Sequence, residues 1–190
     1  ETLRQCIDSD ALNQLSIKLK ESIDMSSYTK QEVKQLVDGT LAWDTVHQMI
    51  SMPKDADRYK LYMEVIQDKL SYKHKVIMAL GPHLNLAIRD GDEEIHAFCD
   101  CGKDFGHYKG NWKLNANIYV RDTAEKMDQV YPRLMSPDTS WQVYREYSCP
   151  DCGTMLDIEA PTPWYMCMHD VKPDLKTFFE WVGIPAPAKI

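Results

Sequence analysis

Four of the six cysteines form two close pairs, and these pairs carry the clearest chemistry in the sequence. Cys149 and Cys152 are separated by two residues, a spacing at which one turn presents two thiolates to the same metal ion. Cys99 and Cys101 have a one-residue gap, and a glycine follows each pair. Two such pairs supply the four sulfur ligands of tetrahedral zinc. We therefore predict a structural Zn²⁺ site formed by Cys99, Cys101, Cys149 and Cys152.

Several other cysteines and histidines offer alternatives to this ligand set. His96 and His107 flank the first pair, and either could replace a cysteine. Cys6 and Cys167 stand alone and are interpreted as small core residues. Cys167 lies two residues before His169, but a lone cysteine is more often a small core residue than a nucleophile, so we do not predict a catalytic pair there. Free buried cysteines or two disulfides are the remaining alternatives to the zinc site.

Other catalytic chemistry is weakly represented. The sequence lacks a GxxxxGK[ST] phosphate loop and a GxGxxG dinucleotide turn, so we predict no nucleotide-binding and no catalytic residues in this chain. Asp157 and Glu159 alternate on a predicted strand and could form an acid/base pair, although solvated charges are the simpler interpretation. A weakly basic, aromatic stretch is the only nucleic-acid feature, and it contains Lys103, Tyr108, Lys109, Trp112, Lys113 and Arg121.

Composition and charge place the chain among globular proteins. Its 190 residues fit one domain, with 44% hydrophobic and 27% charged residues. The net charge of -7 disfavours a general nucleic-acid binder, which needs basic surface to displace counterions from phosphates. No run approaches the roughly 18 apolar residues of a membrane span, and residues 1–10 lack a secretory pattern. We expect a cytoplasmic protein that binds neither nucleic acid nor membrane.

The elements that must position the cysteines begin with helices. Apolar residues recur at spacings of three and four in the first third of the chain. Thr29 and Glu32 form a capping box, and Gly39 is placed to end that helix. The predicted helices cover residues 3–23, 29–39, 43–50 and about 55–70.

After Gly81 the apolar pattern changes to the alternation of strands. Residues 84–88 and 95–98 flank an Asp90-Gly91 turn and form a predicted hairpin that leads into the first cysteine pair. Residues 112–120 alternate over nine positions, which predicts a strand with one core face. The later predicted elements are a short helix capped by Asp122 and Glu125 that runs through Val130, and extended segments at 141–148 and around 157–159.

The tail contains a proline-rich extended loop at 160–164 and a last helix from Pro173 to Gly183. Together the patterns predict an α+β fold: a small antiparallel zinc-ribbon-like β core with N-terminal helices and a C-terminal helix. The expected regions, all in one compact unit, are a helical region at 1–80, a zinc-binding β region with an inserted strand and helix at 81–160, and a proline-rich arm with the C-terminal helix at 161–190.

Several distinctive segments lie along residues 26–187. They include Ser51-Met52-Pro53-Lys54-Asp55, Cys99-Asp100-Cys101-Gly102-Lys103-Asp104-Phe105, Tyr131-Pro132-Arg133-Leu134-Met135, Cys149-Pro150-Asp151-Cys152-Gly153 and Glu159-Ala160-Pro161-Thr162-Pro163-Trp164-Tyr165. Through them the chain resembles the gamma subunits of acetone carboxylase and related ATP-dependent ketone carboxylases, with the acetophenone carboxylase small subunit as a close relative. Residues 1–24 precede the part that matches.

This resemblance implies a non-catalytic, zinc-binding gamma subunit of a heteromeric ligase that converts acetone and bicarbonate to acetoacetate. It also implies larger alpha and beta partner subunits in an α2β2γ2 heterohexamer, with ATP and Mn²⁺ bound in those partners and structural Zn²⁺ in this chain. The family's cysteine ligands carry over onto Cys99, Cys101, Cys149 and Cys152. Two alternatives are a zinc-ribbon nucleic-acid-binding protein and a self-contained zinc hydrolase.

Overall fold

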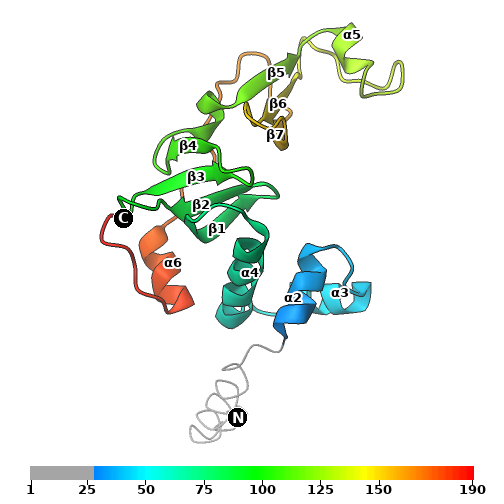
Figure 1. The fold of residues 1–190 in the computed structure, drawn as a ribbon. Coiled ribbons are helices and arrows are strands. Elements are labelled where there is room, and N and C mark those ends of the chain that lie inside the picture. Colours follow the sequence, from blue (N-terminus) through cyan, green and yellow to red (C-terminus); the bar gives the residue numbers. More distant parts are fainter. Residues whose placement is uncertain (1–27) are drawn as a thin grey trace, which may run out of the picture. The chain divides into compact units, whose positions relative to one another are not determined.

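The computed structural model describes residues 28–190, so Cys6 and the helix predicted at 3–23 lie outside the described residues. The described chain divides into two compact units (Figure 1). The first contains the residues up to Val65 together with Trp181–Gly183, and the second contains Ile66–Glu180 and Ile184–Ile190. Helices and antiparallel sheets are both present, which confirms the coarse prediction of a mixed fold.

Three helices follow the sequence pattern closely: α2 (Lys30–Val37), α3 (Trp43–Ser51) and α4 (Ala56–Lys69). The predicted capping box opens α2, because the Thr29 hydroxyl accepts the Glu32 amide while the Glu32 carboxylate accepts the Thr29 amide. Gly39 follows the helix at φ +70°, a conformation that ends helices and favours glycine. The Asp55 carboxylate caps α4 by accepting hydrogen bonds from the backbone amides of Asp57 and Arg58.

The second unit contains a four-stranded antiparallel sheet whose strand order follows the sequence. Its strands are β1 (Lys75–Gly81), β2 (Leu84–Ile88), β3 (Ile95–Cys99) and β4 (Asp104–His107). The predicted hairpin is confirmed as β2 and β3, with Leu86 opposite Ala97. Neither β1 nor β4 was predicted, and β1 starts inside the region expected to be helical. Apolar residues run without alternation through 76–80, and β4 has only four residues, so period-2 patterning could not reveal either strand.

A second antiparallel sheet has the order β5 (Asn117–Arg121), β6 (Tyr144–Ser148) and β7 (Met155–Glu159). The prediction of one strand over 112–120 is wrong, because residues Trp112–Asn115 form a 3₁₀ turn, η1. The Asn111 side chain accepts the Lys113 amide and starts this turn, so Trp112 and Lys113 both point into the interior. A strand would send consecutive side chains to opposite faces. The expected core face is also wrong, since Ile118 and Tyr119 of β5 are exposed.

The short helix α5 (Ala124–Met127) is capped by Thr123, which accepts the Lys126 amide, rather than by the predicted Asp122. It also ends three residues before the predicted Val130. The last helix, α6 (Leu175–Val182), ends before Gly183 as predicted. Within residues 28–190, no helix has both the length and the apolarity that crossing a membrane requires.

The core of the second unit lies around both sheets and the start of α6. Leu86 and Phe105 come from the first sheet, Tyr147 from the second and Phe179 from α6, and all four are buried. Cys99 and Cys149 belong to the same buried cluster. The core therefore fixes the strand ends from which the two cysteine pairs project.

Candidate metal centre

The first cysteine pair lies in the turn between β3 and β4. Cys99 is the last residue of β3, and its amide donates to the carbonyl of Lys103 at 2.9 Å, which closes the turn. The Gly102 amide donates to the carbonyl of Cys99 at 2.8 Å. Gly102 has φ +94°, which residues with a Cβ rarely adopt, and this conformation lets the chain reverse immediately after Cys101.

The second pair lies in the corresponding turn between β6 and β7. Cys149 directly follows β6, and its amide donates to the carbonyl of Thr154 at 2.9 Å. The Gly153 amide donates to the carbonyl of Cys149 at 2.9 Å, and Gly153 has φ +74°. Both turns therefore use the same design, in which backbone hydrogen bonds tighten the loop and a left-handed glycine follows the second cysteine.

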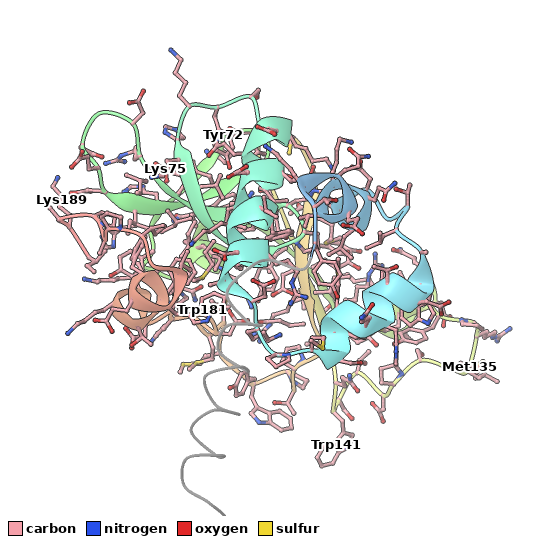
Figure 2. The ribbon with its side chains drawn as sticks, turned by 90° about the horizontal axis from the view of Figure 1, so that it is seen from below. Tyr72, Lys75, Met135, Trp141, Trp181 and Lys189 are labelled. Carbon is pink, nitrogen blue, oxygen red and sulfur yellow. The ribbon has the colours of Figure 1, made fainter. Side chains whose placement is uncertain are left out.

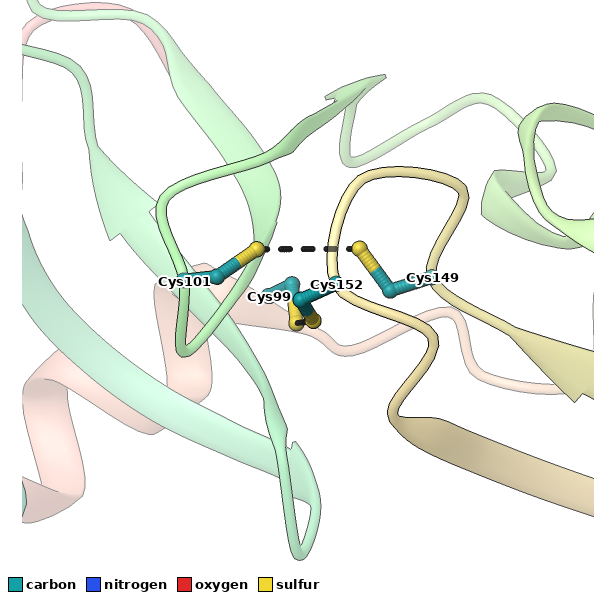
Figure 3. A group of neighbouring side chains, drawn as sticks. All are labelled: Cys99, Cys101, Cys149 and Cys152. Carbon is teal, nitrogen blue, oxygen red and sulfur yellow. Dashed lines mark hydrogen bonds between the residues drawn. The ribbon is translucent and has the colours of Figure 1, made fainter.

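The two turns bring all four sulfur atoms together (Figure 3). The Sγ–Sγ distances are 3.7 Å between Cys99 and Cys152 and 3.6 Å between Cys101 and Cys149, and all four sulfurs lie within 4.8 Å of one another. Disulfide sulfurs would be about 2.05 Å apart, so the cysteines are free thiols. Four sulfurs at about 2.3 Å from one ion have tetrahedral edges of about 3.8 Å. The donor set and its spacing fit zinc.

Charge and burial differ across the sulfur cluster. Cys99 and Cys149 are buried, whereas Cys101 and Cys152 are exposed. Desolvation of the sulfur atoms inside the cluster raises the pKa of the Cys99 and Cys101 thiols, although the Cys101 residue as a whole is exposed. Hydrogen bonds to the Thr154 side chain and backbone lower the pKa of Cys152 to about 6. A divalent cation would replace the protons of the buried thiols, since zinc binds thiolates.

Polar contacts brace the turns from outside. The Asp100 carboxylate accepts a hydrogen bond from Asn85 Nδ2 at 2.8 Å and lies 2.9 Å from His83 Nδ1. Lys103 Nζ of the first turn lies 3.4 Å from the Asp151 carboxylate of the second turn. This ion pair links the two turns directly, independently of any ion.

The alternative ligands occupy other positions. His96 Nδ1 lies 2.8 Å from the Asp104 carboxylate, and the His96 ring is in edge contact with the His107 ring. Among the described residues, the cysteine group contains neither histidine. Cys167 Sγ lies 3.4 Å from the Tyr147 hydroxyl, and this cysteine is half-buried and packs against the core cluster rather than lying inside it.

A buried lysine forms a second cluster that the sequence patterns did not reveal. The Lys113 side chain is 0% exposed, and its Nζ lies 2.9 Å from Asp157, 2.5 Å from Glu159 and 2.7 Å from Asp170. The three carboxylates lie close enough to hold a metal ion, but the ammonium group already binds all of them. Asp157 and Glu159 are thus ion-paired, not the solvated charges that the sequence suggested.

The chemistry of this lysine cluster is that of a closed charge network. Burial by itself lowers the pKa of Lys113, but hydrogen bonds to Asp170, Glu159 and Asp157 outweigh burial and raise it above its usual value. The Tyr147 hydroxyl also donates to Glu159 at 2.6 Å. A lysine held fully charged in this way is unsuited to act as a base or nucleophile.

The predicted basic, aromatic stretch does not form a basic surface. Lys113 and Trp112 are buried, Arg121 pairs with Glu146 at 2.5 Å, and Lys103 pairs with Asp151. Most of its positive charge is therefore compensated within the chain.

Comparison with known proteins gives two matches. Residues 70–182 match the family described as acetone carboxylase gamma subunit. The chain is also similar to the acetone carboxylase gamma subunit of Xanthobacter autotrophicus, with 48% identity over 164 residues that cover 86% of this chain and 98% of that protein. Both cysteine pairs and Lys113 lie inside the family match. These matches confirm the resemblance inferred from the sequence.

Proposed function

Because the chain belongs to the acetone carboxylase gamma subunit family, we propose that it is the zinc-binding, non-catalytic gamma subunit of a heteromeric ligase. That enzyme would convert acetone and bicarbonate to acetoacetate at the expense of ATP. The identity to a gamma subunit over nearly the whole length of that relative is the observation that carries this proposal.

Zinc would be held by Cys99, Cys101, Cys149 and Cys152. Support comes from the sulfur spacings of 3.6 and 3.7 Å, which match the edges of a ZnS₄ tetrahedron, and from two turns of the same design. Bound zinc would cross-link the two sheets of the second unit in a zinc-ribbon-like arrangement. Structural zinc contributes on the order of 10 kcal/mol to folding, far more than the cost of closing the intervening loop.

A structural role follows from the coordination chemistry. Four thiolates complete the zinc shell, so water has no open position at which to be activated. This argues against a zinc hydrolase. In the cluster around Lys113, the ammonium group already forms ion pairs with the three neighbouring carboxylates. Catalysis is thereby assigned to larger alpha and beta subunits, with ATP and Mn²⁺ bound there.

The remaining parts of the proposal concern assembly. We infer an α2β2γ2 heterohexamer in the cytoplasm, in which residues 81–160 form the zinc-binding region. A nucleic-acid-binding role is disfavoured because the net charge is -7 and the basic stretch is internally paired.

Metal analysis of untagged protein tests the zinc site. We expect one zinc per chain in the wild type, loss of zinc in Cys149→Ser, and full zinc content in Cys167→Ser, a matched control outside the cluster. Wild type without stoichiometric zinc, or Cys149→Ser with all of it, would contradict the site.

Native mass spectrometry of the complex from the host tests the subunit role. We expect two larger chains to accompany this one, and carboxylation by the assembled complex to need this chain. Purification of the chain without larger partners would refute the subunit role.

A further inference from the structure

The proline-rich arm, residues 160–170, is fixed to the second sheet through its backbone and one acidic side chain. Its anchoring contacts include the following: the Val143 amide donates to the Pro161 carbonyl at 2.9 Å, the Arg145 guanidinium donates to the Tyr165 carbonyl, Asn111 Nδ2 donates to the Cys167 carbonyl at 3.0 Å, and Lys113 Nζ binds Asp170 at 2.7 Å. These contacts fix the arm at points spread along its length.

The large side chains of the arm point away from those anchors. Trp164, Tyr165 and Met166 are all exposed, with Trp164 at 68% and Met166 at 73%. Trp141, just before β6, is 69% exposed and makes an edge contact with Trp164 at a centroid distance of 6.3 Å. Figure 2 shows Trp141 projecting outward from the ribbon. We call Trp141, Trp164, Tyr165 and Met166 the arm patch.

The loop between α5 and β6 presents further apolar groups. Leu134 is 93% exposed and has φ +65°, a left-handed conformation that costs a non-glycine residue about 1 kcal/mol or more. Met135 beside it is also exposed and projects outward in Figure 2. A strained backbone that holds an apolar side chain in water brings the isolated chain no benefit in stability.

Composition and rigidity of the arm patch are those of a protein-binding surface. Tryptophan, tyrosine and methionine are enriched at the cores of protein interfaces, and tryptophan and tyrosine dominate binding energy. Residues 162–168 contain no charged side chain, so the patch suits an apolar cleft, not a polyanion or an anionic membrane. Because its backbone is already anchored, docking costs little ordering entropy.

We propose that the arm patch docks this chain onto a larger, non-identical subunit of the carboxylase, which offers an apolar cleft to Trp164 and Trp141. The proposal rests on the proposed function, since membership of a gamma subunit family supplies partners of a different kind. Lys113 is a positioning residue in this scheme, because its bond to Asp170 fixes the end of the arm.

The test measures the affinity of the full-length, zinc-loaded chain for the larger subunits of the host complex prepared without it. Trp164→Ala and Met166→Lys should each raise the Kd about 30-fold or more, the effect of removing an interface hot spot. Trp43→Ala is the matched control, because Trp43 is 69% exposed in the other unit, and it should leave the Kd unchanged. Zinc content and circular dichroism verify that each variant is folded; Met166→Lys keeps the test valid if Trp164→Ala misfolds.

The outcomes separate the two proposals. Wild-type chain that binds no larger subunit refutes the proposed function itself. Wild-type binding that Trp164→Ala and Met166→Lys leave intact, or that Trp43→Ala weakens equally, overturns only the arm patch. If the isolated chain is a dimer that these variants convert to a monomer while affinity for the larger subunits is unchanged, the patch binds a second copy and the proposal is wrong.

Discussion

Replacing Lys113 by methionine should strongly destabilise the second unit. The substitution keeps the volume of the side chain but removes the ammonium group that binds Asp157, Glu159 and Asp170 at 2.5 to 2.9 Å. It leaves three carboxylates within 4.8 Å of one another with no ammonium group between them, while Arg145 Nη1 still lies 3.9 Å from Glu159. Removing one partner of a buried ion pair typically costs about 3–5 kcal/mol. The carboxylates keep partial contact with solvent, so we expect a loss of about 3 kcal/mol.

Urea unfolding of zinc-loaded protein, followed by circular dichroism, measures this loss. In a thermal unfolding scan, a loss of about 3 kcal/mol would lower Tm by roughly 6–12 °C for a chain of this size. Lys109→Met is the control, because Lys109 is an exposed lysine four residues away, and it should change stability by less than about 0.5 kcal/mol. Asp157→Asn in the Lys113→Met background should recover about 1 kcal/mol, since it removes one of the repelling charges.

Two results would refute this reasoning. A Lys113→Met protein as stable as the wild type would mean that the carboxylates are hydrated well enough to need no ammonium. A loss that Asp157→Asn does not reduce would point to packing against Trp112 and Tyr147, whose rings lie 5.8 and 5.1 Å from Nζ, and not to charge.

Three further predictions concern a turn, a hydrogen-bonded carboxylate and a helix cap. Gly153→Ala places a Cβ at φ +74° and should cost about 1–2 kcal/mol and weaken zinc retention against a chelator; unchanged retention would contradict the turn argument. Burial raises the pKa of Asp104, but hydrogen bonds from His96 and neighbouring groups lower it overall. The stabilisation that the Asp104 carboxylate provides is therefore present above the unfolded pKa of about 3.9 and is lost as pH falls through the lower folded pKa. Asp104→Asn should cost about 2 kcal/mol of unfolding free energy at pH 7 and progressively less in acid. A difference between variant and wild type in urea unfolding that does not change with pH would contradict this prediction. Thr29→Ala removes the α2 cap and should speed amide hydrogen exchange at Glu32 and Val33, consistent with a loss of about 1 kcal/mol; equal exchange rates would argue against the capping box.

Local chemistry in the sequence was sufficient for much of the structure. The cap at Thr29, the glycine after α2 and the turn at Asp90-Gly91 act within a few residues, so they predicted α2 and the β2–β3 hairpin correctly. The spacing of the cysteine pairs was likewise a local signal, and the four sulfur atoms do lie together. Their ligation of zinc stays a prediction.

Tertiary structure alone decided where Lys113 points. Its alternating neighbours predicted a strand, but the side chain meets Glu159 and Asp170, which lie 46 and 57 residues further along the chain. No local pattern encodes such partners, because ion pairs form between whichever residues the fold brings together. The same holds for β1 and β4, whose neighbours in the sheet, not their own periodicity, make them strands. The sequence by itself determined the thiols, the cap of α2 and the family, whereas the fold decided which charges are buried, because burial depends on contacts between distant segments.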